Sequence, residues 1–398
     1  MDVFSWEQRK FSDFTFPAGE RNKDDLDLEP YAITNNQGFI AQSEAHDDFG
    51  YMKDVDRKMY IVVKPNSFAY NPARINVGSL GYYEGAENVI VSSLYEVFQT
   101  AEYVDDKFLK HWFKTKAFQD WIERLQEGSV RLYFYYDKLC ECVMSMPSVE
   151  EQRKIGAYLD KLDNLITLHQ RKCDALQKFK KSMLQKMFPQ NGESVPEIRF
   201  AGFTDAWEQR KCSDFIKLVG GATPSKANKD YWDGDIVWLS SQEIKGGFVS
   251  KGTYNITQKA VDDNTTKMIP ANTPMFISRS GILANSFPIT RALCNVAINQ
   301  DIKALLFDHT VFSNDYIVHY LESKEQFILK SIVKSGTTVQ SISIPDFEKM
   351  PINIPASKDE QDRIGIYFEN LDTLITLHQR KLETLQKMKK SLLQKMFV

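Results

Sequence analysis

One long segment occurs twice in this chain, and the repeat constrains the fold more than any other feature. Residues 151–188 read EQRKIGAYLDKLDNLITLHQRKCDALQKFKKSMLQKMF, and residues 360–397 match them at 26 of 38 positions without a gap. A shorter segment, WEQRKFSDF at residues 6–14, recurs as WEQRKCSDF at residues 207–215. A period of about 200 residues is far longer than the roughly 20–50 residues of a solenoid unit. The chain therefore contains two copies of a domain-plus-helix unit.

The long repeat has the pattern of a coiled-coil helix. Apolar residues recur at alternating spacings of four and three, which predicts a continuous seam over five heptads. Glutamates and aspartates stand at the start and lysines at the end, as the helix dipole favours. The seam residues of the first copy are Ile155, Leu159, Leu162, Ile166, His169, Cys173, Leu176, Lys180, Met183 and Met187, and those of the second lie 209 positions further on.

Two helices of equal length on one chain are expected to pair with each other. Each helix of about 38 residues would be about 57 Å long. The sequence leaves parallel and antiparallel pairing open, but His169 and His378 occupy a seam position near the middle of each copy. In an antiparallel pair these histidines would lie close together, and a polar seam residue is a known device for setting register. Leu165, Leu168, Leu374 and Leu377 lie outside the seam and are predicted to be either additional core or a docking surface for another subunit.

Composition places the chain among folded proteins without a membrane span. It has 398 residues and a net charge of −3, with no apolar run of the about 18 residues that a span needs and no signal peptide at its start. Five scattered cysteines are typical of buried thiols in a reducing cytoplasm. Residues 16–135 carry 13 basic and 19 acidic side chains, and residues 216–344 carry 13 and 11. Any contact with nucleic acid is therefore expected to come from local patches.

The two regions between the repeats are predicted to be globular bodies of mixed α/β (α+β) fold. Turn residues separate short apolar runs, which predict strands near residues 60–63, 75–77 and 89–91 in the first body and 236–239, 275–278 and 302–307 in the second. Helices are expected at 105–125 and 314–330. We predict four parts: an N-terminal body at 1–148, a central helix at 149–190, a linker and second body at 191–357, and a C-terminal helix at 358–398.

The sequence contains none of the short motifs of common enzymes or metal sites. It has no phosphate-binding loop, no dinucleotide fingerprint, no nucleophile elbow and no histidine pair at metal-ligand spacing. Both bodies instead carry amides, hydroxyls and guanidinium groups on turns. Arginine favours the O6/N7 edge of guanine, and asparagine or glutamine the N6/N7 edge of adenine. Each turn alone could be an ordinary one, but their recurrence favours DNA contact. The candidates are Asn71, Arg74, Asn76 and Ser79 in the first body, and Ser240, Gln242, Arg279, Ser280, Asn299 and Gln300 in the second.

Over nearly its full length the chain resembles the specificity (S) subunit of a type I restriction–modification system. The resemblance rests on the two repeated helices with their LITLHQRK and LQKMF segments and on the repeated WEQRK. The bodies contribute YNPARINVGS at residues 70–79, GATPS at 221–225, AINQDI at 297–302 and SGTT at 335–338. The segment before Trp6 is shorter than the one before Trp207, so we expect a shortened start or a differently placed initiator.

The resemblance implies two target-recognition domains, each reading half of a bipartite DNA site through the major groove. The long helices would form an antiparallel spacer that sets the gap and docks two modification (M) subunits. Those subunits would hold S-adenosylmethionine, and separate restriction (R) subunits would use ATP and magnesium. The S subunit itself would be a non-catalytic, cytoplasmic protein without a cofactor. Two alternatives remain: a coiled-coil scaffold with two unlike ligand-binding heads, and a fused nuclease or methyltransferase.

Overall fold

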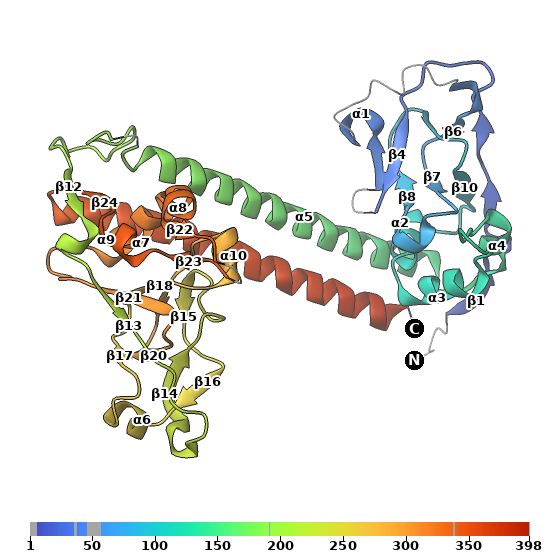
Figure 1. Ribbon diagram of the computed structural model, residues 1–398. Helices are drawn as coiled ribbons and strands as arrows, with labels where there is room; N and C mark the ends of the chain where they lie inside the picture. The colour runs from blue at the N-terminus through green and yellow to red at the C-terminus, as the bar shows by residue number, and fades with distance from the viewer. Residues whose placement is uncertain (1–5, 36–37, 46–56, 191, 337–338, 398) are drawn as a thin grey trace. The chain divides into compact units, whose positions relative to one another are not determined.

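The structure is a computed structural model that describes residues 6–35, 38–45, 57–190, 192–336 and 339–397. The chain forms two compact units (Figure 1). The first unit comprises residues 1–170 and 380–398, and the second comprises residues 171–379. Each long helix contributes a stretch to both units. A unit is therefore a globular body together with one part of each helix, and not a body alone.

The two long helices, α5 (Val149–Lys186) and α10 (Lys358–Met396), pair in opposite directions. In the first unit Asp163 on α5 pairs with Lys389 on α10, and Trp6 contacts both Glu151 and Phe397. In the second unit Lys180 Nζ lies 2.7 Å from Asp372 Oδ2, and the rings of Phe188 and Phe368 are stacked 5.6 Å apart. Residue numbers rise along α5 as they fall along α10 in both units, which confirms the antiparallel coiled coil.

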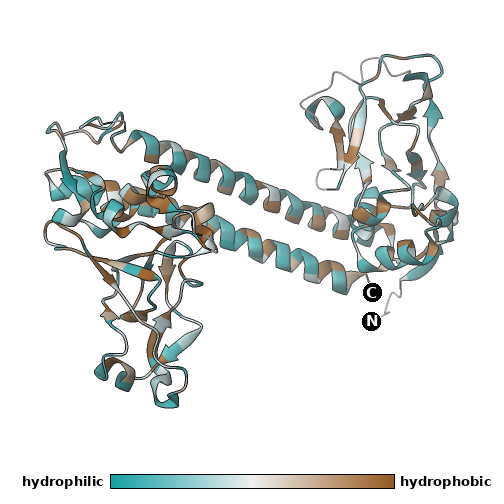
Figure 2. Ribbon diagram, in the orientation of Figure 1, coloured by the Kyte–Doolittle hydropathy of each residue, from teal (hydrophilic) through white to brown (hydrophobic). Residues whose placement is uncertain are grey.

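Hydrophobic and hydrophilic residues are interspersed along both long helices, as Figure 2 shows. Ile155, Leu159 and Leu162 are buried in the first unit, and their equivalents Ile364, Phe368 and Leu371 are buried in the second. The prediction that His169 and His378 lie close together stays a prediction, because His169 belongs to the first unit and His378 to the second.

The repeated WEQRK segment forms a strand in each unit that leads the chain against the start of a long helix. Strand β1 (Glu7–Lys10) pairs antiparallel with β11 (Val143–Met146), and β12 (Glu208–Lys211) pairs in the same way with β24 (Pro351–Ile354). The preceding tryptophan donates to a glutamate on the helix, Trp6 to Glu151 at 3.4 Å and Trp207 to Glu360 at 3.3 Å. The repeated WEQRK segment therefore makes the same tertiary contact with the long helix in both units.

The body of the first unit is built from small antiparallel sheets and short helices. Its largest sheet has the order β2 (Thr15–Pro17), β10 (Glu96–Thr100), β7 (Ser67–Tyr70) and β8 (Leu80–Tyr83). The remaining elements are β3 (Glu20–Arg21), β6 (Ile61–Val63) and β9 (Val89–Val91) in one sheet, β4 (Tyr31–Thr34) with β5 (Gly38–Ala41), and helices α1 (Gln42–Ala45), α2 (Asp106–Trp112), α3 (Lys116–Leu125) and α4 (Tyr136–Glu141).

The body of the second unit contains two larger mixed sheets. One has the order β13 (Lys217–Gly220), β21 (Ile302–Leu306), β18 (Pro274–Ile277), β19 (Ile289–Ala292) and β15 (Gly247–Val249). The other has the order β16 (Tyr254–Ile256), β14 (Trp232–Leu239), β20 (Val296–Ile298) and β17 (Met268–Ile269). The remaining elements are β22 (Val333–Lys334) with β23 (Ser341–Ile342), and helices α6 (Gln258–Asp262), α7 (Asn314–Ser323), α8 (Glu325–Phe327) and α9 (Ile344–Glu348).

One predicted strand is wrong. Residues Ile75–Val77 form a single turn of 3-10 helix that ends at Gly78, which has φ = +92°. The β-branched residues suggested a strand, but the Asn71–Pro72 turn and a glycine able to adopt a left-handed conformation close the chain into a turn. The strands predicted near residues 60, 89, 236, 275 and 302 are present, and the first predicted helix is split into α2 and α3.

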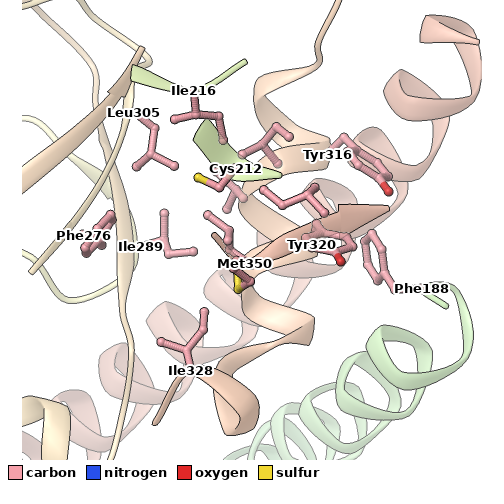
Figure 3. Close-up of a cluster of buried hydrophobic side chains, with 14 of the residues drawn as sticks. Phe188, Cys212, Ile216, Phe276, Ile289, Leu305, Tyr316, Tyr320, Ile328 and Met350 are labelled. Carbon is pink, nitrogen blue, oxygen red and sulfur yellow. The ribbon is translucent and has the colours of Figure 1, made fainter. Parts of the chain in front are cut away.

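The same contact joins the body to the long helix in both units. Gln152 on α5 accepts a hydrogen bond from the backbone of Asp105 at 2.9 Å, and Gln361 on α10 accepts one from Ser313 at 3.0 Å. Figure 3 shows the resulting core of the second unit, where Phe188, Tyr316 and Tyr320 converge beside Met350. The globular body and the long helix thus share one core in each unit.

Two further observations concern the described residues as a whole. Cys142, Cys173 and Cys212 are buried free thiols, whereas Cys140 is half-buried and Cys294 is exposed. Within the described ranges, no helix is both long and apolar enough to cross a membrane.

Candidate nucleic-acid interface

The predicted DNA-contacting turn of the first unit is compact and presents two polar side chains and Val77 to solvent. It follows β7, and the Oδ1 of Asn71 accepts a hydrogen bond from the backbone of Ala73 at 3.0 Å. The backbone of Ser79 donates to the carbonyl of Arg74 at 3.1 Å, which closes the turn. Arg74 and Asn76 are exposed, and neither side chain has a partner among the described residues. These two remain the best placed to contact DNA.

Two other predicted residues support the turn from within. Ser79 is 2% exposed, and its hydroxyl donates to the carbonyl of Ile33 at 3.1 Å. Asn71 is half-buried and already holds the backbone of the turn. Because a buried donor is costly to leave unpaired, both side chains are committed to the fold in this conformation. Sequence reasoning could not separate them from Arg74, since all four are polar residues in one turn.

In the second unit, predicted residues from three distant segments lie at one end of the sheets. The backbone of Asn299 donates to the carbonyl of Leu239, beside Ser240, at 3.0 Å. Ser278 donates to the carbonyl of Asp301 at 2.7 Å through its backbone. The carboxyl end of β14, the end of β18 and the loop between β20 and β21 are therefore neighbours. The prediction named these segments separately, and the fold brings them together.

The side chains of this end divide into exposed and supporting residues. Gln242, Arg279 and Gln300 are exposed. The supporting residues make local contacts: Ser240 donates to Glu243 at 2.7 Å, Ser280 accepts from the backbone of Ile282 at 3.4 Å, and Asn299 accepts from that of Asp301 at 3.1 Å. Burial acts to raise the pKa of Glu243, but hydrogen bonds from Thr253 and Ser240 outweigh it, and the pKa is lowered. The supporting residues thus fix the loops that carry Gln242, Arg279 and Gln300.

Sequence reasoning missed Thr223 as a member of this group. Its hydroxyl donates to the Oε1 of Gln300 at 2.8 Å, across 77 residues of sequence. The contact orients the exposed amide of Gln300 and ties the 221–225 loop to the end of β20. The GATPS segment was noted only as a sequence resemblance, and nothing local in it indicates this pairing. Thr337 and Thr338, in the SGTT segment, lie outside the described residues.

A basic cleft lies beside the turn of the first unit. Its volume is about 1300 Å³, and Ile75 and Gly78 of the turn line it together with Asp160 and Asp163. Its lysines are Lys107, Lys110, Lys114, Lys116 and Lys389. Burial, then the charges of Lys389 and Lys110, lower the pKa of Lys114, while Asp163 acts to raise it. Five lysines and three carboxylates, Glu84, Asp160 and Asp163, line the cleft, so its lining is net basic in a body that is acidic in total. Each of these lysines is also ion-paired with a carboxylate of the same unit.

The contact between the globular body and the long helix contains a buried histidine in each unit. The pKa values of these two histidines are shifted in opposite directions. In the first unit His111 is buried and 2.9 Å from Asp160, and burial is the main cause that lowers its pKa. In the second, His319 is 2.8 Å from Glu322; burial acts to lower its pKa, but the carboxylates of Glu322 and Glu369 outweigh this and raise it. His319 Nε2 lies 3.4 Å from Glu369 Oε1, an ion-pair distance without hydrogen-bond alignment.

His319, Glu322 and Asp372 place their ligand atoms within 4.8 Å of one another, as a cation site would. Lys180 Nζ already lies 2.9 Å from Glu322 and 2.7 Å from Asp372. A single ammonium group therefore already pairs with both carboxylates. We interpret the cluster as an ionic joint between α5, α7 and α10.

The predicted docking leucines are mostly exposed. Leu168 is 45% exposed in the first unit, and Leu374 and Leu377 are 45% and 56% exposed in the second. Leu165 is half-buried and packs against the first core. Leu168 and Leu377 are equivalent in the repeat, so each unit exposes one of them. Leu168, Leu374 and Leu377 are therefore not core residues in this structure, and their role in docking another subunit stays a prediction.

The chain matches the family model of the type I restriction modification DNA specificity domain twice, over residues 32–178 and 204–387. It is 33% identical over 168 residues to the specificity subunit of the Escherichia coli type I restriction enzyme EcoR124I/EcoR124II. That alignment covers 42% of this chain and 41% of the relative, so the chain spans less than half of that relative's length. A specificity subunit of Methanocaldococcus jannaschii, MjaX, is 21% identical over 98% of this chain and 92% of its own.

Solved structures of similar fold cover the whole chain. An S subunit of a type I restriction–modification system from M. genitalium aligns with a TM-score of 0.65 at 13% identity, covering 100% of this chain and 97% of its own. A chain from a type I R-M system, studied for complex assembly and conformational transition, aligns with a TM-score of 0.51 at 15% identity over 99% and 97%. The double family match covers most of the sequence, and the chain belongs to the type I restriction modification DNA specificity domain family.

Proposed function

We propose that this chain is the DNA-recognition subunit of a type I restriction–modification complex. Each body would read one half of a bipartite site, with phosphate contacts that position the protein and base contacts that specify the sequence. The single observation that carries the proposal is the convergence of Gln242, Arg279 and Gln300 at one end of the second body. The exposed Arg74 and Asn76 beside the basic cleft support the same role for the first body.

The helices would dock two modification subunits and set the gap between half-sites. Each unit exposes a leucine from the repeat and a second apolar residue from the other helix: Leu168 with Met388 in the first, Leu377 with Phe179 in the second. Exposed apolar groups at equivalent positions favour two copies of one partner. The chain itself would act in the cytoplasm without chemistry of its own, with S-adenosylmethionine on the modification subunits and ATP and magnesium on the restriction subunits.

Long-read methylome sequencing of cells that express the chain with its modification subunit tests this proposal. We expect methylation at one bipartite sequence, with both half-sites and their gap visible in the same data. Arg74→Ala should relax or abolish recognition of one half-site only, and Arg279→Ala of the other only, because each lost base contact costs about 1–3 kcal/mol. Each variant is the control for the other.

The alternative of a scaffold with two non-DNA ligands predicts a different result. In that case both arginine variants would leave DNA methylation as it is in the wild type. Methylation that is unchanged in both variants, with the complex assembled, would therefore count against DNA reading by these turns.

A further inference from the structure

A short loop in the first unit is held in a rigid, projecting shape. The backbones of Glu127 and Tyr133 exchange hydrogen bonds of 2.8 and 2.7 Å, which closes the loop between them. Gly128 has φ = +129°, and a Cβ at this position would lie 2.0 Å from the carbonyl oxygen of Arg131. Only glycine permits this turn. We call residues 127–133 the first-unit finger.

The tip of the finger presents an apolar and a cationic side chain to solvent. Val130 is 95% exposed, more than any other large hydrophobic residue among those the structure describes. The charge of Glu127 is neutralised by Lys138, whose Nζ lies 2.7 Å from Oε1. Arg131 is exposed, and its guanidinium has no partner within the described part of the chain. The exposed valine and the unpaired arginine together form a surface that is available to a ligand.

The finger is anchored directly beside the turn that carries Arg74. Phe134, at its base, is fully buried and donates through its backbone to the carbonyl of Pro72 at 3.0 Å. The rings of Tyr133 and Tyr135 on either side are stacked with centroids 5.5 Å apart. The base of the finger and the Arg74 turn are therefore neighbours.

In the second unit, the segment that carries Arg279 also has a neighbour from a distant part of the chain. Strand β23 is bonded to the end of β18, with the backbone of Ile342 donating to the carbonyl of Ser278 at 2.8 Å and Arg279 bridged to Ser341. The arginine-bearing segment is therefore supported by a distant segment of the same unit in both units.

We propose that the first-unit finger is a DNA-contacting element, with Val130 packed against apolar groups in a groove and Arg131 paired with a phosphate. This inference rests on the proposed function and adds residues that the sequence did not indicate. The thymine methyl group is an apolar contact that a groove offers to valine, and phosphate attracts an unpaired guanidinium. Val130 and Arg131 position the Arg74 turn on the first half-site.

Photocross-linking in the assembled complex tests the contact directly. A benzoylphenylalanine replaces Val130, and in a matched control it replaces Leu94, which is 70% exposed on another turn of the same unit. With a duplex that contains the methylated site, we expect a covalent DNA adduct from position 130 and none from position 94. A cross-link from position 130 to a protein subunit, or no cross-link there, would overturn the proposal.

Binding measurements give a second, independent readout. Arg131→Ala should lower DNA affinity of the complex by roughly tenfold and reduce the slope of log affinity against log salt by about 0.9, the value for one phosphate contact. Val130→Ser should lower affinity at unchanged slope, and Leu94→Ser should match the wild type. If both finger variants kept the wild-type affinity and the wild-type salt slope, the proposed DNA contact of the first-unit finger would be refuted. Failure of the proposed function itself would show separately, as a wild-type complex that methylates no bipartite site.

Discussion

At the scale of the residue, two histidines at equivalent places in the two units have opposite electrostatic surroundings. His111 faces Asp160 and Asp163 but also Lys110, Lys114 and Lys389, whereas His319 faces Glu322 and Glu369, with Lys180 as a nearby cation. The pKa of the first is lowered, with burial as the main cause, and that of the second is raised despite burial, through its carboxylate partners. The two long helices are thus closely similar in sequence, but the charged groups at their contacts with the two bodies differ.

Removal of one lysine from the ionic joint should destabilise the second unit strongly. Lys180→Met leaves the half-buried carboxylates of Glu322 and Asp372 without their ammonium partner, and the loss of such a partner costs about 1–3 kcal/mol. The equivalent Lys389→Met should cost less, because Lys114 remains 3.6 Å from Asp163. Urea unfolding of both variants checks this order. A smaller loss for Lys180→Met than for Lys389→Met would show that the joint is not held by this lysine.

The two joints should respond to pH in opposite directions. His319 has a raised pKa, so its contribution to folding stability is complete below its unfolded pKa of about 6.5 and is lost as pH rises through the folded value. His111 has a lowered pKa, so its contribution is present above about 6.5 and is lost as pH falls through the folded value. Hydrogen exchange of α7 and α2 between pH 5 and 9 measures each joint.

The matched variants His319→Gln and His111→Gln serve as controls for that measurement. Each should flatten the pH dependence of its own helix and leave the other helix unchanged. Protection of both helices that changes in the same direction with pH would contradict the assignment.

At the scale of the element, a glycine in each long helix marks the place where the body approaches most closely. A Cβ on Gly156 would lie 2.7 Å from both the Oδ1 of Asp105 and the backbone nitrogen of Phe108. On Gly365 it would lie 2.5 Å from the Cβ of Asp315. The short helices α2 and α7 therefore begin against a glycine of the long helix, and the bulk of any side chain would separate them.

Gly156→Ala should destabilise the first unit although alanine is the better helix former. The helical preference gains about 1 kcal/mol, but overpacking against the α2 backbone costs about 1–3 kcal/mol. Thr376→Ala, at an exposed position of α10, isolates the helical gain and should be neutral or slightly stabilising. Thermal unfolding compares the two. If the Gly156→Ala variant were as stable as Thr376→Ala, helix α2 would be able to move away from the added methyl group without loss of folding stability.

The elements that sequence predicted well are those whose pattern is long and periodic. The heptad seam of α5 and α10 was clear because ten positions in each helix repeat the same signal. The segment Ile75–Val77 was predicted as a strand from three residues, and the neighbouring turn and Gly78 decided otherwise. Short apolar runs carry too few positions to separate one local structure from another.

At the scale of the whole molecule, the proposed function would make the spacing of the half-sites a property of the helices. Insertion of four residues, about 6 Å of helix, into both α5 and α10 at equivalent points should move the tolerated gap by roughly one to two base pairs of 3.4 Å each. Both half-sites should stay the same, since the bodies are untouched. Methylome sequencing reads gap and half-sites together. If the complex still methylated DNA with an unchanged gap, the hypothesis that helix length sets the spacing of the half-sites would be wrong.

The sequence by itself determined that the chain is two copies of one unit, where the helices run, and which family it belongs to. Those conclusions rest on periodicity and identity, which are properties of the chain taken locally. Tertiary structure decided that the helices pair antiparallel, that Ser79 is buried while Arg74 is exposed, and that Thr223 meets Gln300 across 77 residues. Contacts between distant segments depend on how all the elements pack together, and no local pattern encodes them.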